Sequence, residues 1–225
     1  MDVIGFDEFG FIHVEIEGVR LIVPDEPSNG HRGLIAAWEA EGNYPLTRTV
    51  EGRRVGILGL GRIGQTIARR AEAFGAEIHY HSRSPKDVPY TYHDSAEACA
   101  RACEVLIAIT PGGDETRHMV GAEVLRALGP DGIFVNVARG SVCDEAALVE
   151  ALQAGTIAGA GLDVFAEEPK IPEALKAMDN VVLTPHVASG THETRQAMGD
   201  LAVGNLLAWL DDGRVKTPVP ECRDL

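Results

Sequence analysis

The fold of this chain is decided by the stretch R-R-V-G-I-L-G-L-G-R-I-G, residues Arg53 to Gly64. It begins with an apolar run, Val55–Leu58, that is typical of a buried strand, and it continues into a glycine-rich turn. The turn is followed by apolar residues at helical spacing, namely Ile63, Ile67, Ala71 and Phe74. A strand, a glycine turn and a helix in this order are typical of a dinucleotide-binding βαβ unit.

Each glycine in this G-x-G-x-x-G pattern has its own physical task. Gly59 permits a tight turn, Gly61 lets a pyrophosphate approach the backbone, and Gly64 lets the helix lie close to the sheet. The phosphates would lie at the helix amino terminus, at Arg62 and Ile63, where free N–H groups and the helix dipole favour an anion. A purely structural turn is the alternative, but the preceding strand and the following helix favour the dinucleotide site.

Composition and charge exclude several classes of protein. The chain has 225 residues, of which 45% are hydrophobic and 24% charged, as in an ordinary globular protein of one or two domains. Because the net charge is −14, we expect no nucleic-acid partner and no anionic membrane surface as a partner. No apolar run approaches the roughly 20 residues that span a bilayer, and the chain does not open with a signal pattern. A cytoplasmic protein is therefore expected.

The four cysteines do not form a metal-binding pattern. They contain no C-x-x-C, and no histidines cluster at metal-ligand spacing around them. We therefore expect no metal site, and we interpret the cysteines as small buried hydrophobic residues in a reducing compartment. They are Cys99, Cys103, Cys143 and Cys222.

From Arg53 onward, short apolar runs alternate with helical patterns, which predicts an α/β fold with a Rossmann-type, doubly wound parallel sheet. Residues 1–48 are rich in glycine and proline, and they predict only a short strand at Val19–Val23 and a brief helix at Leu34–Glu41. The later strands are expected at Glu77–His81, Tyr90–Tyr92, Val105–Thr110, Ile133–Val137, Ile157–Leu162 and Val181–Leu183. Helices are expected from Ser95, over Gly121–Leu128, from the cap Asp144 to Ala154, and from Thr191 to Gly213, the last with apolar residues Met198, Leu201, Ala202, Leu206 and Trp209 at a period of 3.6.

The unusual residues of the sequence fall just after the carboxyl ends of these strands. In an open α/β sheet, ligands bind at that edge. The residues concerned are Gly59, Ser82, Arg83, Thr110, Pro111, Ala138, Arg139, Asp163, Glu168 and His186.

The second strand of the unit predicts the type of nicotinamide cofactor. NAD-binding folds usually place an acid there for the ribose hydroxyls, but this chain has His81-Ser82-Arg83-Ser84. A carboxylate would repel a 2′-phosphate, whereas an arginine and two hydroxyls can bind it. We therefore predict NADP(H) as the preferred cofactor, with NAD(H) as an alternative. An ordinary solvated turn before Pro85 is the competing interpretation.

Three residues suit hydride transfer to a keto acid. Arg139 ends a buried strand, where its planar donors match a carboxylate and the adjacent keto oxygen. His186 follows an apolar strand and can donate a proton to the oxygen that becomes an alkoxide. Glu168 could hydrogen-bond that imidazole and stabilise its protonated form, although Glu167 could do the same. Each residue also has a purely structural alternative. Arg139 could form a surface ion pair, His186 could be a buried structural histidine, and Glu168 could be an ordinary loop carboxylate.

Residues 50–220 closely resemble the D-isomer-specific 2-hydroxyacid dehydrogenases, particularly the glyoxylate/hydroxypyruvate reductase group. The resemblance rests on G-I-L-G-L-G-R-I-G, T-P-G-G-D-E-T-R-H, N-V-A-R-G-S-V-C-D-E-A-A-L, G-L-D-V-F-A-E-E-P and T-P-H-V-A-S-G-T-H-E-T-R.

The resemblance implies a role for each of these site residues. It implies that Arg139 binds substrate, that Glu168 rather than Glu167 orients the histidine, and that His186 is the acid/base. It also implies that Asp163 contacts the nicotinamide amide. The residues around Thr110, Pro111, Val137 and Ala138 would line the cofactor. The implied reaction is reduction of a small 2-keto acid by NADPH to the D-2-hydroxy acid.

The sequence departs from the family ahead of Arg53. Family members carry a complete flavodoxin-like substrate lobe there, whereas residues 1–48 suffice only for a remnant, with a faint likeness to the carboxylate-binding loop at Ile4–His13. We therefore predict a truncated lobe at 1–48, a dinucleotide-binding domain at 49–190, and a terminal helix and tail at 191–225.

The short front end leaves two interpretations of function open. One is a working reductase that forms a homodimer if the linking helix of the family is functionally replaced here. The other is a weakly active or non-catalytic NADP(H)-binding paralogue or interaction module. The paired acid and base favour the enzyme, because a pure binding protein has no evident need for them.

Overall fold

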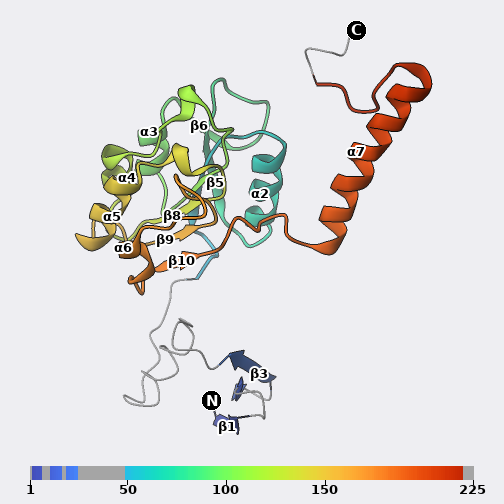
Figure 1. Cartoon of the computed structure of the whole chain (residues 1–225). Helices are drawn as coiled ribbons and strands as arrows, with labels where there is room; N and C mark the ends of the chain where they lie inside the picture. Colours follow the sequence, from blue (N-terminus) through green and yellow to red (C-terminus); the bar gives the residue numbers. More distant parts are fainter. Residues whose placement is uncertain (1, 7–10, 17–18, 25–48, 220–225) are drawn as a thin grey trace. The chain divides into compact units, whose positions relative to one another are not determined.

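The computed structural model describes residues 2–6, 11–16, 19–24 and 49–219 (Figure 1). The chain forms two compact units, one of residues 1–53 with 74–76, and one of residues 54–73 with 77–225. In the first unit, strands β1 (Asp2–Phe6), β2 (Phe11–Ile16) and β3 (Val19–Pro24) form an antiparallel sheet in that order.

Of these three strands, the sequence predicted only the third. In β1, Gly5 interrupts the alternation by which a strand is recognised, and the register of β1 on β2 shifts between Val3 and Gly5. β2 contains no glycine, and its apolar residues were missed because Gly10 and Gly18 on either side leave only a short run. The helix expected at Leu34–Glu41 lies outside the described residues. The domain boundaries at 48 and 190 stay predictions.

The second unit contains a seven-stranded parallel sheet in the order β10-β9-β8-β7-β4-β5-β6. The chain starts in its interior at β4 and runs outward to β6. It then returns to the other side of β4 and continues outward from β7 to β10, so the order reverses between β4 and β7. The strands are β4 (Arg54–Leu58), β5 (Glu77–His81), β6 (Thr91–His93), β7 (Val105–Ala108), β8 (Ile133–Asn136), β9 (Gly159–Leu162) and β10 (Val181–Leu183).

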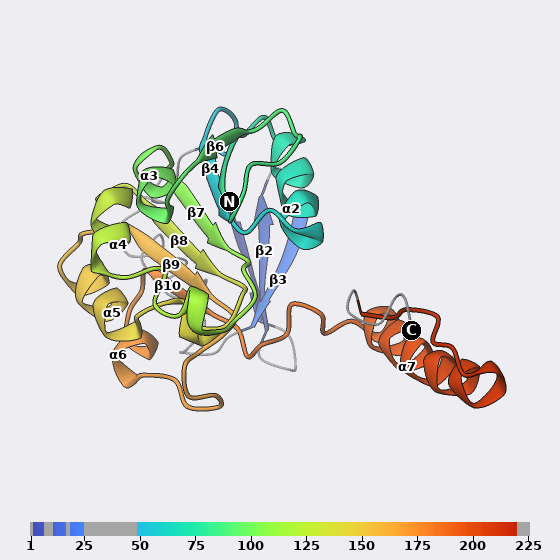
Figure 2. The ribbon, with the colours of Figure 1, turned by 90° about the horizontal axis from the view of Figure 1, so that it is seen from above.

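Helices cover both faces of this sheet, with α2 on one face and α3, α4 and α5 on the other (Figure 2). The main core lies between the sheet and the second group, around fully buried Leu106, Leu125, Phe134 and Leu148. The predicted Rossmann-type, doubly wound parallel sheet is thereby confirmed. The helices are α2 (Arg62–Glu72), α3 (Ala96–Arg101), α4 (Ala122–Leu128), α5 (Glu145–Gln153), α6 (Glu173–Lys176) and α7 (His192–Asp212), with 3-10 turns η1 (Asp114–Thr116) and η2 (Gly140–Val142).

Side-chain caps fix three helix starts where the sequence placed them. Ser95 accepts a hydrogen bond from the N–H of Ala98, Asp144 from those of Ala146 and Ala147, and Thr191 from that of Thr194. The predicted strand β6 is shifted by one residue, and the turns η1 and η2 and the short α6 were not predicted. These elements are only three or four residues long, which is too short for a helical period to be visible.

Of the four apolar residues expected along α2, Ile67 and Ala71 are half-buried, but Ile63 and Phe74 face solvent. Ile63 and Phe74 are 63% and 68% exposed, and the residues that α2 buries are Gly64 and Ala68. The first turn of α2 lies so close to the backbone of Gly59 that no Cβ fits at Gly64.

Helix α7 has the predicted start and ends with Gly213 in a left-handed conformation. None of its side chains is buried among the described residues. Met198, Leu201, Leu206 and Trp209, which were expected to form one apolar face, are between 48% and 58% exposed.

Candidate functional site

The three glycines of the turn after β4 lie in three different environments. Gly59 has a φ of 101°, a conformation that favours glycine. A Cβ atom added to Gly64 would lie 2.1 Å from the carbonyl oxygen of Gly59, so only glycine lets α2 begin here. A Cβ added to Gly61 would meet nothing within 4 Å. The turn therefore offers open space beside the first residues of α2, as a pyrophosphate requires.

Two clefts, of about 710 and 800 Å³, open from this turn at the carboxyl edge of the sheet. The first extends along the loop after β5, and the second runs along α2 toward Arg139. Thr110 lines both clefts, and its hydroxyl oxygen is buried and has no hydrogen-bond partner in the described part of the chain. The clefts are lined by these predicted cofactor residues: Gly59, Gly61, Arg62, Ile63, Gly64, Ser82, Arg83, Ser84, Thr110, Pro111, Val137 and Ala138.

In the loop after β5, two of the three predicted phosphate-binding side chains, those of Ser82 and Arg83, have partners within the protein. The Ser82 hydroxyl donates to the carbonyl oxygen of Ser84 at 2.7 Å, so its proton is not directed at the cleft. The highly exposed Arg83 lies 3.7 Å from Glu115 of η1, across the first cleft. Lys86, which the sequence reading did not single out, also lines this cleft.

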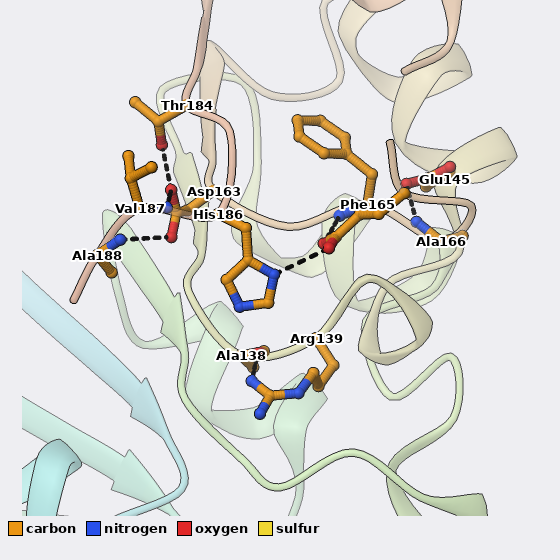
Figure 3. Close-up of polar contacts among 11 residues, drawn as sticks. Ala138, Arg139, Glu145, Asp163, Phe165, Ala166, Thr184, His186, Val187 and Ala188 are labelled. Carbon is orange, nitrogen blue, oxygen red and sulfur yellow. Dashed lines mark hydrogen bonds and ion pairs between the residues drawn. The ribbon is translucent and has the colours of Figure 1, made fainter. Parts of the chain in front are cut away.

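The structure brings Glu168 and His186 together. Oε2 of Glu168 lies 2.9 Å from Nδ1 of His186, and its Oε1 accepts a hydrogen bond of 3.0 Å from the Phe165 N–H (Figure 3). These hydrogen bonds and the charge of Arg139 hold the pKa of Glu168 below its ordinary value. No contact of Glu167 with His186 is present among the described residues, so the geometry distinguishes the two acids that the chemistry alone left open.

His186 itself has a φ of 53°, in the left-handed region that few residues other than glycine occupy. Its side chain is 45% exposed. The second ring nitrogen is turned toward the guanidinium of Arg139 (Figure 3). That nitrogen is the atom from which a proton could reach a substrate held by the arginine.

Asp163 is buried, and its carboxylate holds the segment that carries His186. Oδ1 accepts from the Thr184 hydroxyl at 2.6 Å and from the Val187 N–H at 2.9 Å, and Oδ2 accepts from the Ala188 N–H at 3.1 Å (Figure 3). Burial acts to raise the pKa of Asp163, but these hydrogen bonds and the nearby His186 outweigh it, so the pKa lies below its ordinary value. Asp163 lines neither cleft, and its expected contact with the nicotinamide amide stays a prediction.

Arg139 does not have the buried position that the sequence suggested. Strand β8 ends at Asn136, so Arg139 lies beyond the sheet edge, is exposed, and donates to the carbonyl oxygen of Ala138 at 2.6 Å. Buried Asn136 determines this turn, because its side chain accepts from the Ala138 N–H and donates to the Arg139 carbonyl oxygen, both at 3.1 Å. Sequence reasoning missed Asn136, although an asparagine at a strand end is a turn signal.

Gly140 and Glu145 were missed as well. A Cβ on Gly140 would lie 1.9 Å from the backbone carbon of Phe165, so glycine lets the Arg139 turn pack on the segment that carries Glu168. Glu145, in the first turn of α5, accepts a hydrogen bond of 2.7 Å from the Ala166 N–H. These contacts join the two segments, and nothing in a single sequence indicates them.

The described residues contain no reactive cysteine and no metal site beside the residues discussed above. Cys99, Cys103 and Cys143 are buried free thiols, and burial raises the pKa of Cys143, which makes it unreactive. Cys222 lies outside the described residues. Within the described ranges, no cluster of histidine, cysteine and acidic side chains is arranged to hold a metal ion, and no helix is long and apolar enough to span a membrane.

Residues 30–188 match the family model described as D-isomer specific 2-hydroxyacid dehydrogenase, NAD binding domain. The chain is 43% identical to a hydroxyphenylpyruvate reductase of Plectranthus scutellarioides, over 96% of this chain and 76% of the relative. It is 48% identical to glyoxylate/hydroxypyruvate reductase A of Arabidopsis thaliana, over 80% of this chain and 58% of the relative.

Solved structures give the same result. An NADPH-dependent glyoxylate/hydroxypyruvate reductase of Sinorhizobium meliloti, in complex with NADP and malonate, is 55% identical with a TM-score of 0.78. The match covers 82% of this chain and 58% of that chain. A 2-hydroxyacid dehydrogenase of Ketogulonicigenium vulgare is 44% identical with a TM-score of 0.78, over 84% of this chain and 63% of the other. The chain thus spans about three fifths of the length of several relatives.

Proposed function

The chain belongs to the D-isomer specific 2-hydroxyacid dehydrogenase family, and we propose that it catalyses NADPH-dependent reduction of a small 2-keto acid, of the glyoxylate or hydroxypyruvate type, to the D-2-hydroxy acid. The observation that carries this proposal is the Glu168–His186 pair at 2.9 Å, with Arg139 beside it. An acid/base couple facing a cation suits a substrate with a carboxylate and a carbonyl.

The residues of the two clefts fit a nicotinamide dinucleotide. The space beside Gly61 and the start of α2 suit its pyrophosphate. Thr110, whose buried hydroxyl has no hydrogen-bond partner in the described residues, lines both clefts. When bound, the cofactor supplies the hydride. The preference for NADPH is supported by the loop after β5, where Arg83 and Lys86 are cationic and no acid stands at the usual position.

The protein's own residues handle the substrate and the proton. The guanidinium of Arg139 would hold the substrate carboxylate and polarise the keto oxygen, because its donors lie in one plane. Nε2 of His186 would donate a proton to that oxygen. The carboxylate of Glu168, hydrogen-bonded to Nδ1, keeps the ring oriented.

A second candidate, a cofactor-binding protein without efficient catalysis, is favoured by one observation. The side chains of His186 and Glu168 are 45% and 37% exposed, whereas hydride-transfer sites profit from exclusion of water. A homodimer, expected from the sequence, stays a prediction for either candidate.

One experiment separates these functions. NADPH oxidation is measured with glyoxylate and with hydroxypyruvate, alongside NADPH binding by fluorescence. We expect oxidation with at least one acid, and binding without oxidation would favour the second candidate.

Variants then test the assigned roles. His186→Ala should lower turnover with cofactor binding intact, Arg139→Ala should chiefly weaken keto-acid use, and Glu168→Gln should lower turnover. Glu167→Gln is the matched control, since Glu167 has no contact with His186 in the described structure. Normal turnover of His186→Ala would contradict the mechanism.

A further inference from the structure

The loop over residues 82–86 lines the first cleft, where a 2′-phosphate would lie under the proposed function. Four of its five residues are exposed, and it contains no helix or strand. A loop of this kind binds an anion well only if its conformation is fixed beforehand, because ordering it on binding would cost conformational entropy. Contacts that fix the loop therefore bear on cofactor selection.

A single buried hydroxyl group holds the far end of this loop. The Tyr80 hydroxyl accepts a hydrogen bond of 2.8 Å from the Lys86 N–H and donates one of 3.3 Å to the Lys86 carbonyl oxygen. Both backbone groups of Lys86 are thus tied to one side chain, and Lys86 is one of the residues that line the first cleft. The near end is fixed separately, where the His81 carbonyl oxygen accepts from the Gly59 N–H at 2.9 Å.

Tyr80 is well placed to act as a fixed support. It lies on β5, which pairs with β4 on one side and β6 on the other, and it is only 1% exposed. Its ring packs against Tyr92 of β6 with the centroids 5.4 Å apart. Packing of the ring needs no hydroxyl, so phenylalanine would fill the same space. The hydroxyl is directed to the loop alone.

We propose that Tyr80 is a positioning residue for cofactor selection, whose hydroxyl holds residues 82–86 in the conformation that receives the 2′-phosphate of NADPH. This inference rests on the proposed function, in particular on the preference for NADPH. NADH has no 2′-phosphate, so its binding should not depend on this support. The Tyr80 hydroxyl should therefore change the affinity for NADPH relative to the affinity for NADH.

The test compares Tyr80→Phe with wild type and with Tyr92→Phe, in the full chain. Tyr92 is the matched control, because it lies opposite Tyr80 in register and its hydroxyl makes no hydrogen bond in the described part of the chain. Dissociation constants for NADPH and NADH are measured by fluorescence, and 2′,5′-ADP and 5′-AMP are used as competitors that differ only by the 2′-phosphate.

For Tyr80→Phe we expect NADPH and 2′,5′-ADP to bind about tenfold more weakly, the size of effect that two neutral hydrogen bonds can have. NADH and 5′-AMP should bind as in wild type, and Tyr92→Phe should change nothing. Unchanged NADPH binding by Tyr80→Phe would overturn the inference. Equal weakening of both cofactors would overturn it too, since that is the signature of a merely structural role.

The proposed function fails in a different measurement. If wild type itself does not distinguish NADPH from NADH, the proposed cofactor preference is wrong, and the inference falls with it. If wild type prefers NADPH and Tyr80→Phe retains the preference, only the inference is wrong.

Discussion

At the glycine turn, the groups that would meet the cofactor are backbone N–H groups and open space, whereas at the edge formed by Asp163 and His186 they are side chains held by other side chains. Gly59 and Gly64 determine the shape of the turn, and the missing side chain of Gly61 leaves the space beside it open. The catalytic edge depends on contacts between segments that are 18 to 25 residues apart.

The two regions should therefore be sensitive to different kinds of substitution. In the turn, a substitution disturbs the structure or the cofactor site by adding a Cβ atom, because glycine has no side chain to remove. At the catalytic edge, removal of one acceptor releases several donors at once, since the carboxylate of Asp163 alone accepts three hydrogen bonds. The following substitutions test this contrast, in order of decreasing expected effect.

Gly140→Ala should have the largest effect, because its Cβ would lie 1.9 Å from backbone atoms that cannot move independently. We expect a loss of unfolding free energy of about 3–5 kcal/mol, at the upper end of point substitutions. Thermal denaturation measures this loss. Gly161→Ala is the control, because its Cβ would meet only ordinary contacts at 3.8 Å and beyond. Equal stability of the two variants would show that the segments do not pack as described.

Asp163→Asn should lower turnover by up to about 10²-fold, the cost of misplacing a reacting group by about 1 Å. An amide can accept at one oxygen only, so one of the three donors loses its partner. NADPH oxidation under saturating substrate measures the effect, and the cofactor dissociation constant serves as the control for a direct role at the nicotinamide. A variant with reduced cofactor affinity but normal turnover would contradict the positioning role.

The same residue predicts a pH dependence. Because the folded-state pKa of Asp163 is lowered, its contribution to stability is present above its ordinary pKa of 3.8 and is lost as the pH falls through the lowered value. Below pH 3.8, wild type should therefore lose stability through protonation of Asp163, and Asp163→Asn should not show this loss. Denaturation midpoints of both proteins over this range measure the difference, which should vanish if Asp163 titrates equally in both states.

Gly61→Ala should weaken cofactor binding by about tenfold without loss of stability, since its Cβ enters only the space reserved for the pyrophosphate. Gly64→Ala is the comparison variant. Because its Cβ would collide with the Gly59 carbonyl, this substitution should also lower the melting temperature. A destabilised Gly61→Ala would mean that this space is not open.

Glu115→Gln should have the smallest effect, about a twofold gain in NADPH affinity, because exposed ion pairs contribute little. The substitution frees Arg83 and removes a negative charge beside the first cleft. Asp114→Asn, on the same turn, is the control, as Asp114 makes no contact with Arg83 in the described structure. Titration with NADPH and NADH should show the gain for NADPH alone.

The sequence predicted the individual strands and the glycine turn well because their signals are local. The run Val55–Leu58 and the caps Ser95 and Asp144 act on neighbours within a few residues. The role of Gly64 could be inferred because helix and strand adjoin it directly. The inner face of α2 could not, since the apolar residues Ile63 and Phe74 fit a helical pattern equally well on an outward face.

The catalytic edge was predicted only as far as its chemistry is visible residue by residue. Strand ends indicated that Arg139 and His186 share an edge, and resemblance selected Glu168. The supports could not be predicted, because Asn136, Gly140 and Tyr80 act through contacts that exist only in the folded chain. Their residue types are ordinary for a strand end, a turn and a strand interior.

The left-handed backbone of His186 has an evolutionary consequence. Such a conformation costs a non-glycine residue about 1–2 kcal/mol, so a histidine at this position opposes folding. Glycine adopts the conformation without this cost. Selection for stability alone would thus replace the histidine, and its presence records a compromise in which the protein gives up some robustness to keep an imidazole at this point.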